Sequence, residues 1–125
     1  MRVLLDTHIF LWAIQEDAKL SAPTKTLIKD AQAVFVSTAS IWELAIKASR
    51  GKLNVDVSML ADAIAPSGFT ELPVRVPEAV RVSSLAFIHG DPFDRILIAQ
   101  AMVGSMRFLT ADRVLKQYSP IVIAA

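Results

Sequence analysis

Val3-Leu4-Leu5-Asp6, near the amino end of the chain, is the stretch that decides the fold. Three apolar residues in succession are typical of a strand that is buried on both faces of a sheet. An acid follows them directly. In an α/β fold the loops after the strands gather at one edge of the sheet, and ligands bind there. The stretch therefore predicts a buried strand that carries the carboxylate of Asp6 to a binding edge.

Beyond this stretch, short apolar runs alternate with helical patterns. Strands are predicted at 3–5, 33–36, 69–74, 107–110 and 121–124. Helices are predicted at 9–14, 23–31, 39–50, 57–65, 77–87 and 92–103, with a helical turn at 114–117. This alternation indicates βαβ units and a mostly parallel sheet. With 125 residues and no long linker, the chain is expected to form one domain over 1–125.

Composition narrows the classes of function. The chain is 54% hydrophobic, which fits buried strands covered by helices and leaves room for apolar surface that meets a partner subunit. No apolar run reaches the length of a membrane span, and the amino end lacks the apolar core of a signal peptide, so we expect a cytoplasmic protein without a membrane partner. The absence of cysteine excludes disulfides and thiolate metal sites. A net charge of +1 leaves affinity for nucleic acid to local cations and metal.

Three more acids lie at junctions comparable to that of Asp6. Glu43 lies near the start of one apolar helix, Asp94 near the start of another, and Asp112 just after a strand-like run. Four carboxylates at one edge would repel each other strongly unless a positive charge lay between them. A divalent cation is the candidate, and it points to metal-dependent chemistry on phosphates.

Each of these acids also has a structural interpretation. Asp6 could be the N-cap of the next helix. Glu43 could close a capping box with Ser40, or pair with Lys47 one turn later, and alone it is more often structural. Asp112 could simply cap the turn that follows it.

Asp91-Pro92-Phe93-Asp94 opens the most apolar helix in the chain. Asp91 followed by Pro92 is typical of an N-cap, so we interpret Asp91 as chiefly structural. Asp94 then falls in the first turn, where the helix dipole favours a negative charge. The two histidines, His8 and His89, each lie two residues from a proposed acid. Neither is assigned to the metal, although His89 could touch substrate.

Several motifs are missing. The chain has no GxxxxGK[ST], GxGxxG, GxSxG or HExxH, which argues against nucleotide-cradle folds, a nucleophile elbow and a zincin. Ligand sets made only of oxygen favour Mg²⁺ or Mn²⁺ over Zn²⁺.

Four blocks of this sequence resemble the PIN domain, and in particular its VapC-type toxin branch. They run in the order of that family and cover nearly the whole chain. The blocks are Leu4-Leu5-Asp6-Thr7-His8, Ser40-Ile41-Trp42-Glu43-Leu44-Ala45-Ile46-Lys47, Asp91-Pro92-Phe93-Asp94-Arg95 with Ile98-Ala99-Gln100-Ala101, and Leu109-Thr110-Ala111-Asp112. The second and third blocks together are the specific ones.

The resemblance implies an α/β/α sandwich with a five-stranded parallel sheet in the order 3-2-1-4-5. It implies a metal-dependent endoribonuclease whose acids match Asp6, Glu43, Asp94 and, more variably, Asp112, with Thr7 and Thr110 supporting them. It also implies a homodimer, and a small cognate VapB-type antitoxin that blocks the active site. Operator DNA would be bound through that antitoxin rather than by this domain.

On this hypothesis a metal-activated water hydrolyses an RNA phosphodiester bond and leaves 5′-phosphate and 3′-hydroxyl ends, which would inhibit translation. Five cations are candidates for holding the RNA backbone: Lys47, Arg50, Lys52, Arg113 and Lys116. Two alternatives stay open. One is an aspartyl-phosphate phosphatase with Asp6 as nucleophile, although its usual Asp-x-Asp is replaced by Asp6-Thr7-His8. The other is a non-catalytic domain that binds a metal.

Overall fold

The computed structural model describes residues 1–125 and contains a single five-stranded parallel sheet in the order β3-β2-β1-β4-β5. The order that the resemblance to the PIN domain implied is thereby confirmed. The strands are β1 (Arg2–Leu5), β2 (Ala33–Ser37), β3 (Thr70–Leu72), β4 (Arg107–Thr110) and β5 (Val122–Ala124). The helices are α1 (Thr7–Gln15), α2 (Ala22–Asp30), α3 (Thr38–Ser49), α4 (Val57–Asp62), α5 (Val76–Val82), α6 (Pro92–Val103) and the 3₁₀ helix η1 (Arg113–Gln117).

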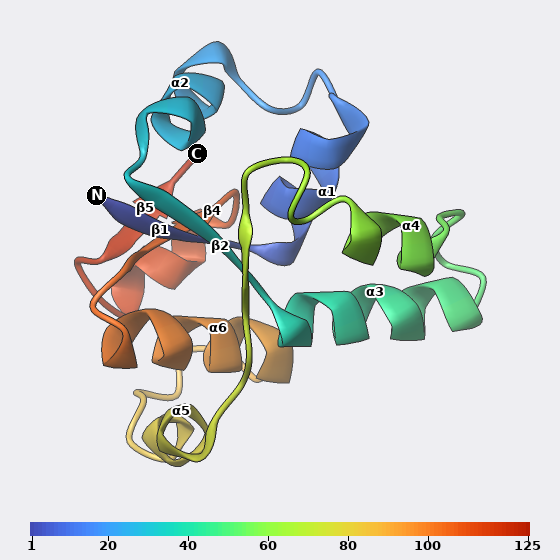
Figure 1. The fold of residues 1–125 in the computed structure, drawn as a ribbon. Helices are drawn as coiled ribbons and strands as arrows, with labels where there is room; N and C mark the ends of the chain where they lie inside the picture. Colours follow the sequence, from blue (N-terminus) through green and yellow to red (C-terminus); the bar gives the residue numbers. More distant parts are fainter.

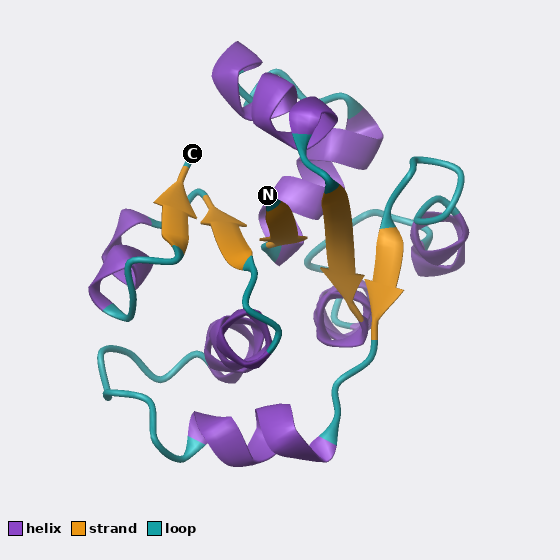
Figure 2. Cartoon of the chain, turned by 60° about the vertical axis from the view of Figure 1, so that its left-hand side comes forward, coloured by secondary structure: helices purple, strands orange, loops and turns teal.

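Helices cover both faces of the sheet, as Figures 1 and 2 show. Because side chains alternate along a strand, β1 sends Val3 and Leu5 to one apolar core and Leu4 to the other. The first core includes residues of α1, α3 and α4, and the second includes residues of α6 and η1. All three of these β1 residues are fully buried, which explains why the strand reads as an unbroken apolar run.

Polar side chains begin several of the helices. Asp6, Ser21 and Ser37 cap α1, α2 and α3 by accepting hydrogen bonds from the first backbone N–H groups of each helix. Asp91 does the same for α6, accepting from the N–H groups of Phe93 and Asp94. The interpretation of Asp91 as an N-cap is confirmed.

The capping box predicted in α3 and the predicted ends of α4 and α5 were wrong, and α4 ends at Asp62 rather than Ala65. Helix α3 begins at Thr38 rather than Ala39, with Ser37 as its cap, so Glu43 lies in the second turn and the proposed capping box with Ser40 does not form. Helix α5 ends at Val82 rather than near Phe87. Beyond Val82 the backbone N–H groups of residues 83–85 bond to carbonyls three residues back rather than four, so the α-helix gives way to tight turns. The hydroxyls of Ser83 and Ser84 also donate to carbonyls of the last turn, and Arg95 donates to the carbonyl of Val82.

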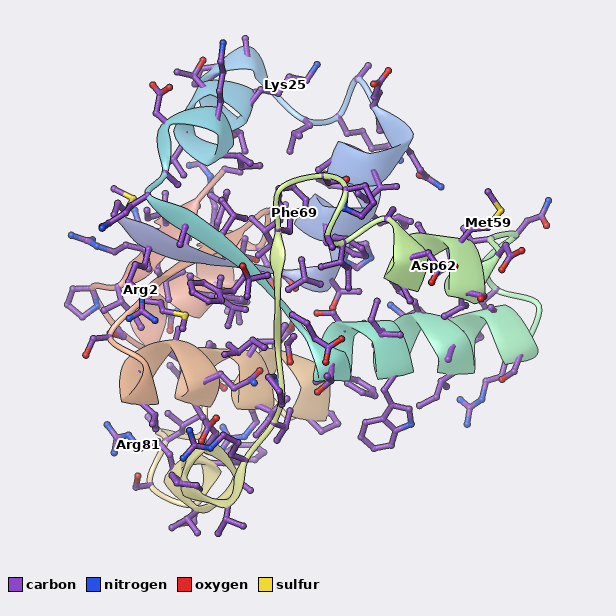
Figure 3. The ribbon with its side chains drawn as sticks, viewed as in Figure 1. Arg2, Lys25, Met59, Asp62, Phe69 and Arg81 are labelled. Atoms are coloured by element: carbon purple, nitrogen blue, oxygen red, sulfur yellow. The ribbon has the colours of Figure 1, made fainter.

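Two apolar side chains outside the strands, Phe69 and Met59, differ in their surroundings. Phe69, just before β3, meets Phe10 edge to face with ring centroids 6.5 Å apart, whereas Met59 on α4 points to solvent (Figure 3). None of the helices combines the length and the apolar character needed to cross a bilayer.

Candidate active site

A cavity of about 420 Å³ opens where β1 and β4 end. It is the most acidic of the larger cavities, because its lining contains five carboxylates and few apolar side chains. The lining residues are Asp6, His8, Trp12, Glu43, Lys47, Asp91, Asp94, Ala111 and Asp112. All four acids predicted from the sequence therefore meet in one place, from segments that are far apart in the chain.

Asp6 is the most firmly held of these acids. Its carboxylate is buried and accepts one hydrogen bond from the Thr7 backbone N–H at 2.7 Å and one from the Thr110 hydroxyl at 2.6 Å. Burial raises the pKa of the Asp6 carboxyl, the two hydrogen bonds oppose that rise, and the neighbouring charge of Glu43 adds to it. Asp6 is thus both the N-cap of α1 and an acid that faces the cavity.

Glu43 is buried beside Asp6 and has two partners of its own. The Thr7 hydroxyl donates to Oε1 at 2.7 Å, and the Lys47 ammonium donates to Oε2 at 2.9 Å. Thr7 therefore joins the two acids, its N–H to Asp6 and its hydroxyl to Glu43. The predicted i, i+4 pair of Glu43 and Lys47 is confirmed.

Asp94 is the acid with the least local compensation. Its side chain is 18% exposed, and Nε2 of His89 lies 3.4 Å from its Oδ2. Loss of water, together with the charges of Asp6, Asp91, Glu43 and Asp112, raises the pKa of Asp94 from 3.8 to about 8. The carboxyl therefore holds a proton at neutral pH when no cation is bound.

Asp112 lies at the rim. Its backbone N–H donates to the Thr110 hydroxyl at 3.0 Å, and its carboxylate caps η1 by accepting from the Val114 N–H. The predicted capping role is confirmed. Three atoms that could bind a metal ion lie within 4.8 Å of one another here. They are a carboxylate oxygen of Asp112, a carboxylate oxygen of Asp94 and a ring nitrogen of His89.

These donors suit a hard divalent cation. Carboxylate oxygens are the ligands that Mg²⁺ and Mn²⁺ prefer. Two of the acids, Asp6 and Asp94, have raised pKa values, chiefly because burial disfavours their charged forms, and nearby acids add to the effect. A cation placed among them would stabilise those charged forms. The chemistry of the cavity thus fits a metal site, and the threonines at positions 7 and 110 orient the acids that would hold it.

Of the five basic residues predicted to hold RNA, only Lys47 lines the cavity. The other four are exposed on the surface outside it. They are Arg50 and Lys52 after α3, and Arg113 and Lys116 in η1.

Sequence reasoning left two cavity features unassigned. His8 and Trp12 line the cavity from α1, with their rings 6.0 Å apart. His89 faces Asp94 from the loop between α5 and α6. In the sequence, only its position two residues before Asp91 pointed to a role for His89. The tyrosine that holds its backbone, Tyr118, comes 29 residues later, so the sequence does not reveal that contact.

The chain resembles known proteins in its sequence. The family described as the PIN domain matches residues 3–119. Ribonuclease VapC22 from Mycobacterium tuberculosis is 30% identical over 122 residues, which are 93% of this chain and 91% of that protein.

Solved structures show the same fold. The complex VapBC2 from Rickettsia felis, bound to a DNA fragment from its promoter, contains a chain that matches with a TM-score of 0.74 at 17% identity, covering 100% of this chain and 98% of that one. DNA-bound VapBC from Salmonella typhimurium gives 0.70 at 14% identity, covering 99% and 98%. The family match covers nearly the whole chain, and Ribonuclease VapC22 aligns with it over 93% of its length. This chain therefore belongs to the PIN domain family.

Proposed function

We propose that this protein is a metal-dependent endoribonuclease that acts as the toxin of a VapBC-type toxin–antitoxin pair. The observation that carries the proposal is the cavity itself: Asp6 and Glu43 are buried side by side, and Asp94 faces them with a pKa raised to about 8. Clusters of this kind are costly to fold, so a role in binding a cation is the simplest reason to keep them. The family match and a relative named as a ribonuclease support the same reaction.

The residues that would hold the cation are Asp6, Glu43 and Asp94, with Asp112 at the rim. Mg²⁺ or Mn²⁺ fits their oxygen donors. When bound, such an ion lowers the pKa of a water molecule and stabilises negative charge on a phosphate.

The side chains around the acids have separate tasks in this mechanism. Thr7 and Thr110 fix the carboxylates of Asp6 and Glu43 through hydrogen bonds of 2.6 to 2.7 Å. Lys47 lies at the wall of the cavity and can contact a phosphate of the RNA backbone. Because water is the nucleophile, the 2′-hydroxyl of the RNA takes no part. Departure of the ribose 3′-oxygen then leaves 5′-phosphate and 3′-hydroxyl ends.

The remaining cations would extend the RNA path. Arg50 and Lys52 follow the helix that carries Lys47, and Arg113 and Lys116 follow the acid at the rim. Their exposure lets them bind phosphates at little desolvation cost. Cleavage of RNA needed for protein synthesis would inhibit translation in the cytoplasm, where that RNA is found.

A partner that silences the enzyme is part of the proposal. Two structural neighbours are VapBC complexes bound to DNA, which supports a cognate VapB-type antitoxin here. We infer that the antitoxin covers the acidic cavity, and that operator DNA is bound through it. The net charge of +1 on this chain gives no strong electrostatic attraction to DNA of its own.

We also propose a homodimer. Trp42 on α3 is 64% exposed and meets Phe93 edge to face at 5.2 Å, and together they line an apolar groove of about 570 Å³. On the neighbouring α5, Val76 and Val80 are 75% and 63% exposed. Such a concentration of exposed apolar side chains is typical of a subunit interface.

The test of the reaction uses structured RNA, the purified parent protein and the variant Asp6→Asn, each with Mn²⁺ and with EDTA. We expect the parent to cut only with metal and to leave 5′-phosphate ends, and Asp6→Asn to be inactive but folded. Asp62→Asn, on the exposed end of α4 (Figure 3), is the matched control and should cut like the parent. Equal cutting by parent and Asp6→Asn would refute the metal mechanism. An acyl-phosphate trapped on Asp6 would instead indicate a phosphatase.

A further inference from the structure

His89 faces the acids of the cavity but has no part in the reaction described above. Its side chain is 25% exposed, and Nε2 lies 3.4 Å from Oδ2 of Asp94. It belongs to the loop that joins α5 to α6 (Figure 1). Two roles are chemically open: the ring nitrogen is itself a metal ligand, or it orients the carboxylate that is one.

The loop around His89 is held in place by side chains from two other elements. The Tyr118 hydroxyl, just after η1, accepts from the His89 backbone N–H and donates to its carbonyl, each at 3.2 Å. Arg95 of α6 donates to the same hydroxyl at 3.1 Å and to the carbonyl of Ala86 at 3.0 Å. The rings of His89 and Tyr118 also meet edge to face at 5.8 Å. The imidazole is therefore preorganised rather than free to swing.

The hydrogen bonds of the ring decide between the two roles. The backbone N–H of Asp91 donates to Nδ1 of His89 at 3.2 Å. Nδ1 must therefore offer a lone pair, and the single ring proton sits on Nε2. A nitrogen that carries a proton has no lone pair for a metal, so the nitrogen that faces Asp94 is a donor.

We propose that His89 is a positioning residue for Asp94. Its Nε2–H faces Oδ2 of Asp94 and turns the other oxygen of that carboxylate toward the cation site. At 3.4 Å the contact is longer than an ordinary hydrogen bond, and such contacts commonly shorten when a site is loaded. Partners of this kind, which hold a metal ligand in its binding orientation, typically contribute about 10- to 100-fold in metal affinity. This inference rests on the metal site of the proposed function.

The first experiment measures the ring proton directly. The chain has only two histidines, so ¹⁵N-histidine labelling gives two imidazoles, and a His8→Gln sample assigns them. In the metal-free parent we expect the nitrogen spectrum of His89 to show a proton on Nε2 and none on Nδ1. A proton on Nδ1 would overturn the proposal. This result does not depend on whether any variant folds.

The second experiment measures Mn²⁺ affinity by calorimetry. We expect His89→Ala to weaken binding about 10- to 100-fold, and His89→Gln, whose amide N–H can replace the donor, to recover part of that loss. Asp62→Asn, which changes an exposed side chain on α4 outside the cavity, is the control and should bind like the parent. Equal Mn²⁺ affinity of His89→Ala and the parent would overturn the proposal.

Electron paramagnetic resonance of the Mn²⁺-loaded parent separates the two roles of the ring. We expect no coupling from a directly bound histidine nitrogen. If such coupling appears in the parent and vanishes in His89→Ala, His89 is a ligand and the positioning role is wrong. If the parent neither binds Mn²⁺ nor cuts RNA, the proposed function fails instead. The ring-proton measurement then still decides whether His89 donates toward Asp94.

Discussion

Asp94→Asn should stabilise the metal-free protein at neutral pH, because it removes a carboxyl that resists ionisation in the fold. The pKa of Asp94 rises from 3.8 to about 8, owing first to burial and then to four neighbouring acids. Between these two pKa values the folded protein keeps a proton that the unfolded chain has released. Stability therefore falls as the pH rises through this range, and the full stability is present only below the lower value.

The size of this effect follows from the width of the range. Each pH unit over which the folded state holds the extra proton costs about 1.4 kcal/mol. At about pH 7 the limit for Asp94 acting alone is about 4 kcal/mol. Asp6 also has a raised pKa, so it adds to the loss in the same direction. Asparagine has the same shape and no charge, and it should recover most of the loss due to Asp94.

Urea denaturation in EDTA, followed by circular dichroism, measures the effect. We expect the free energies of unfolding of parent and Asp94→Asn to differ by only about 1 kcal/mol at about pH 4.5, and the variant to be more stable by a few kcal/mol at about pH 7.5. Added Mn²⁺ should stabilise the parent and leave Asp94→Asn nearly unchanged. Asp62→Asn is the control for removal of a surface carboxylate. If parent and Asp94→Asn lose stability in parallel as the pH rises, the pKa of Asp94 is not raised in the folded protein.

Three further perturbations test other parts of the site. Thr110→Val removes the donor at 2.6 Å from Asp6 and should lower the rate of RNA cleavage about 10- to 100-fold, whereas Thr110→Ser should retain most of it. Lys47→Met removes the cation at 2.9 Å from Glu43 and should weaken RNA binding, measured by filter retention, while lowering metal-free stability. Trp42→Asp places a charge in the exposed apolar groove and should yield monomers in analytical ultracentrifugation, with folding unchanged. A dimer that persists in Trp42→Asp would place the interface elsewhere.

Much of the fold could be predicted because the signals are local. A strand buried on both faces needs an unbroken apolar run, and Val3 to Leu5 provides one. A cap needs a short polar side chain at one position, as at Ser21 and Asp91. The meeting of Asp6 and Asp112 follows from the parallel direction of the strands, since the loops after β1 and β4 must open at the same edge.

The remaining features depend on contacts that are distant in sequence. At the end of α5, Arg95 donates to the carbonyl of Val82 from another helix. The orientation of His89 is set by the Tyr118 hydroxyl, 29 residues later. Periodicity cannot reveal such contacts, because a hydrogen bond to a backbone carbonyl leaves no repeating pattern in the sequence. The capping box at Ser40 failed for a related reason: Ser37, three residues earlier, is an equally good cap and is closer to the end of β2.

The negative charges of three acids in the cavity are balanced in three different ways. This difference predicts how the binding of a cation depends on pH. Asp6 has two hydrogen-bond donors and Glu43 has an ammonium, whereas Asp94 keeps a proton at neutral pH. A cation that binds Asp94 must displace that proton, so affinity should rise with pH up to about 8 and binding should release close to one proton at about pH 7. Calorimetry in two buffers of different ionisation enthalpy counts that proton. Asp94→Asn should abolish the release, and a parent that binds Mn²⁺ without releasing a proton would show that Asp94 is already ionised.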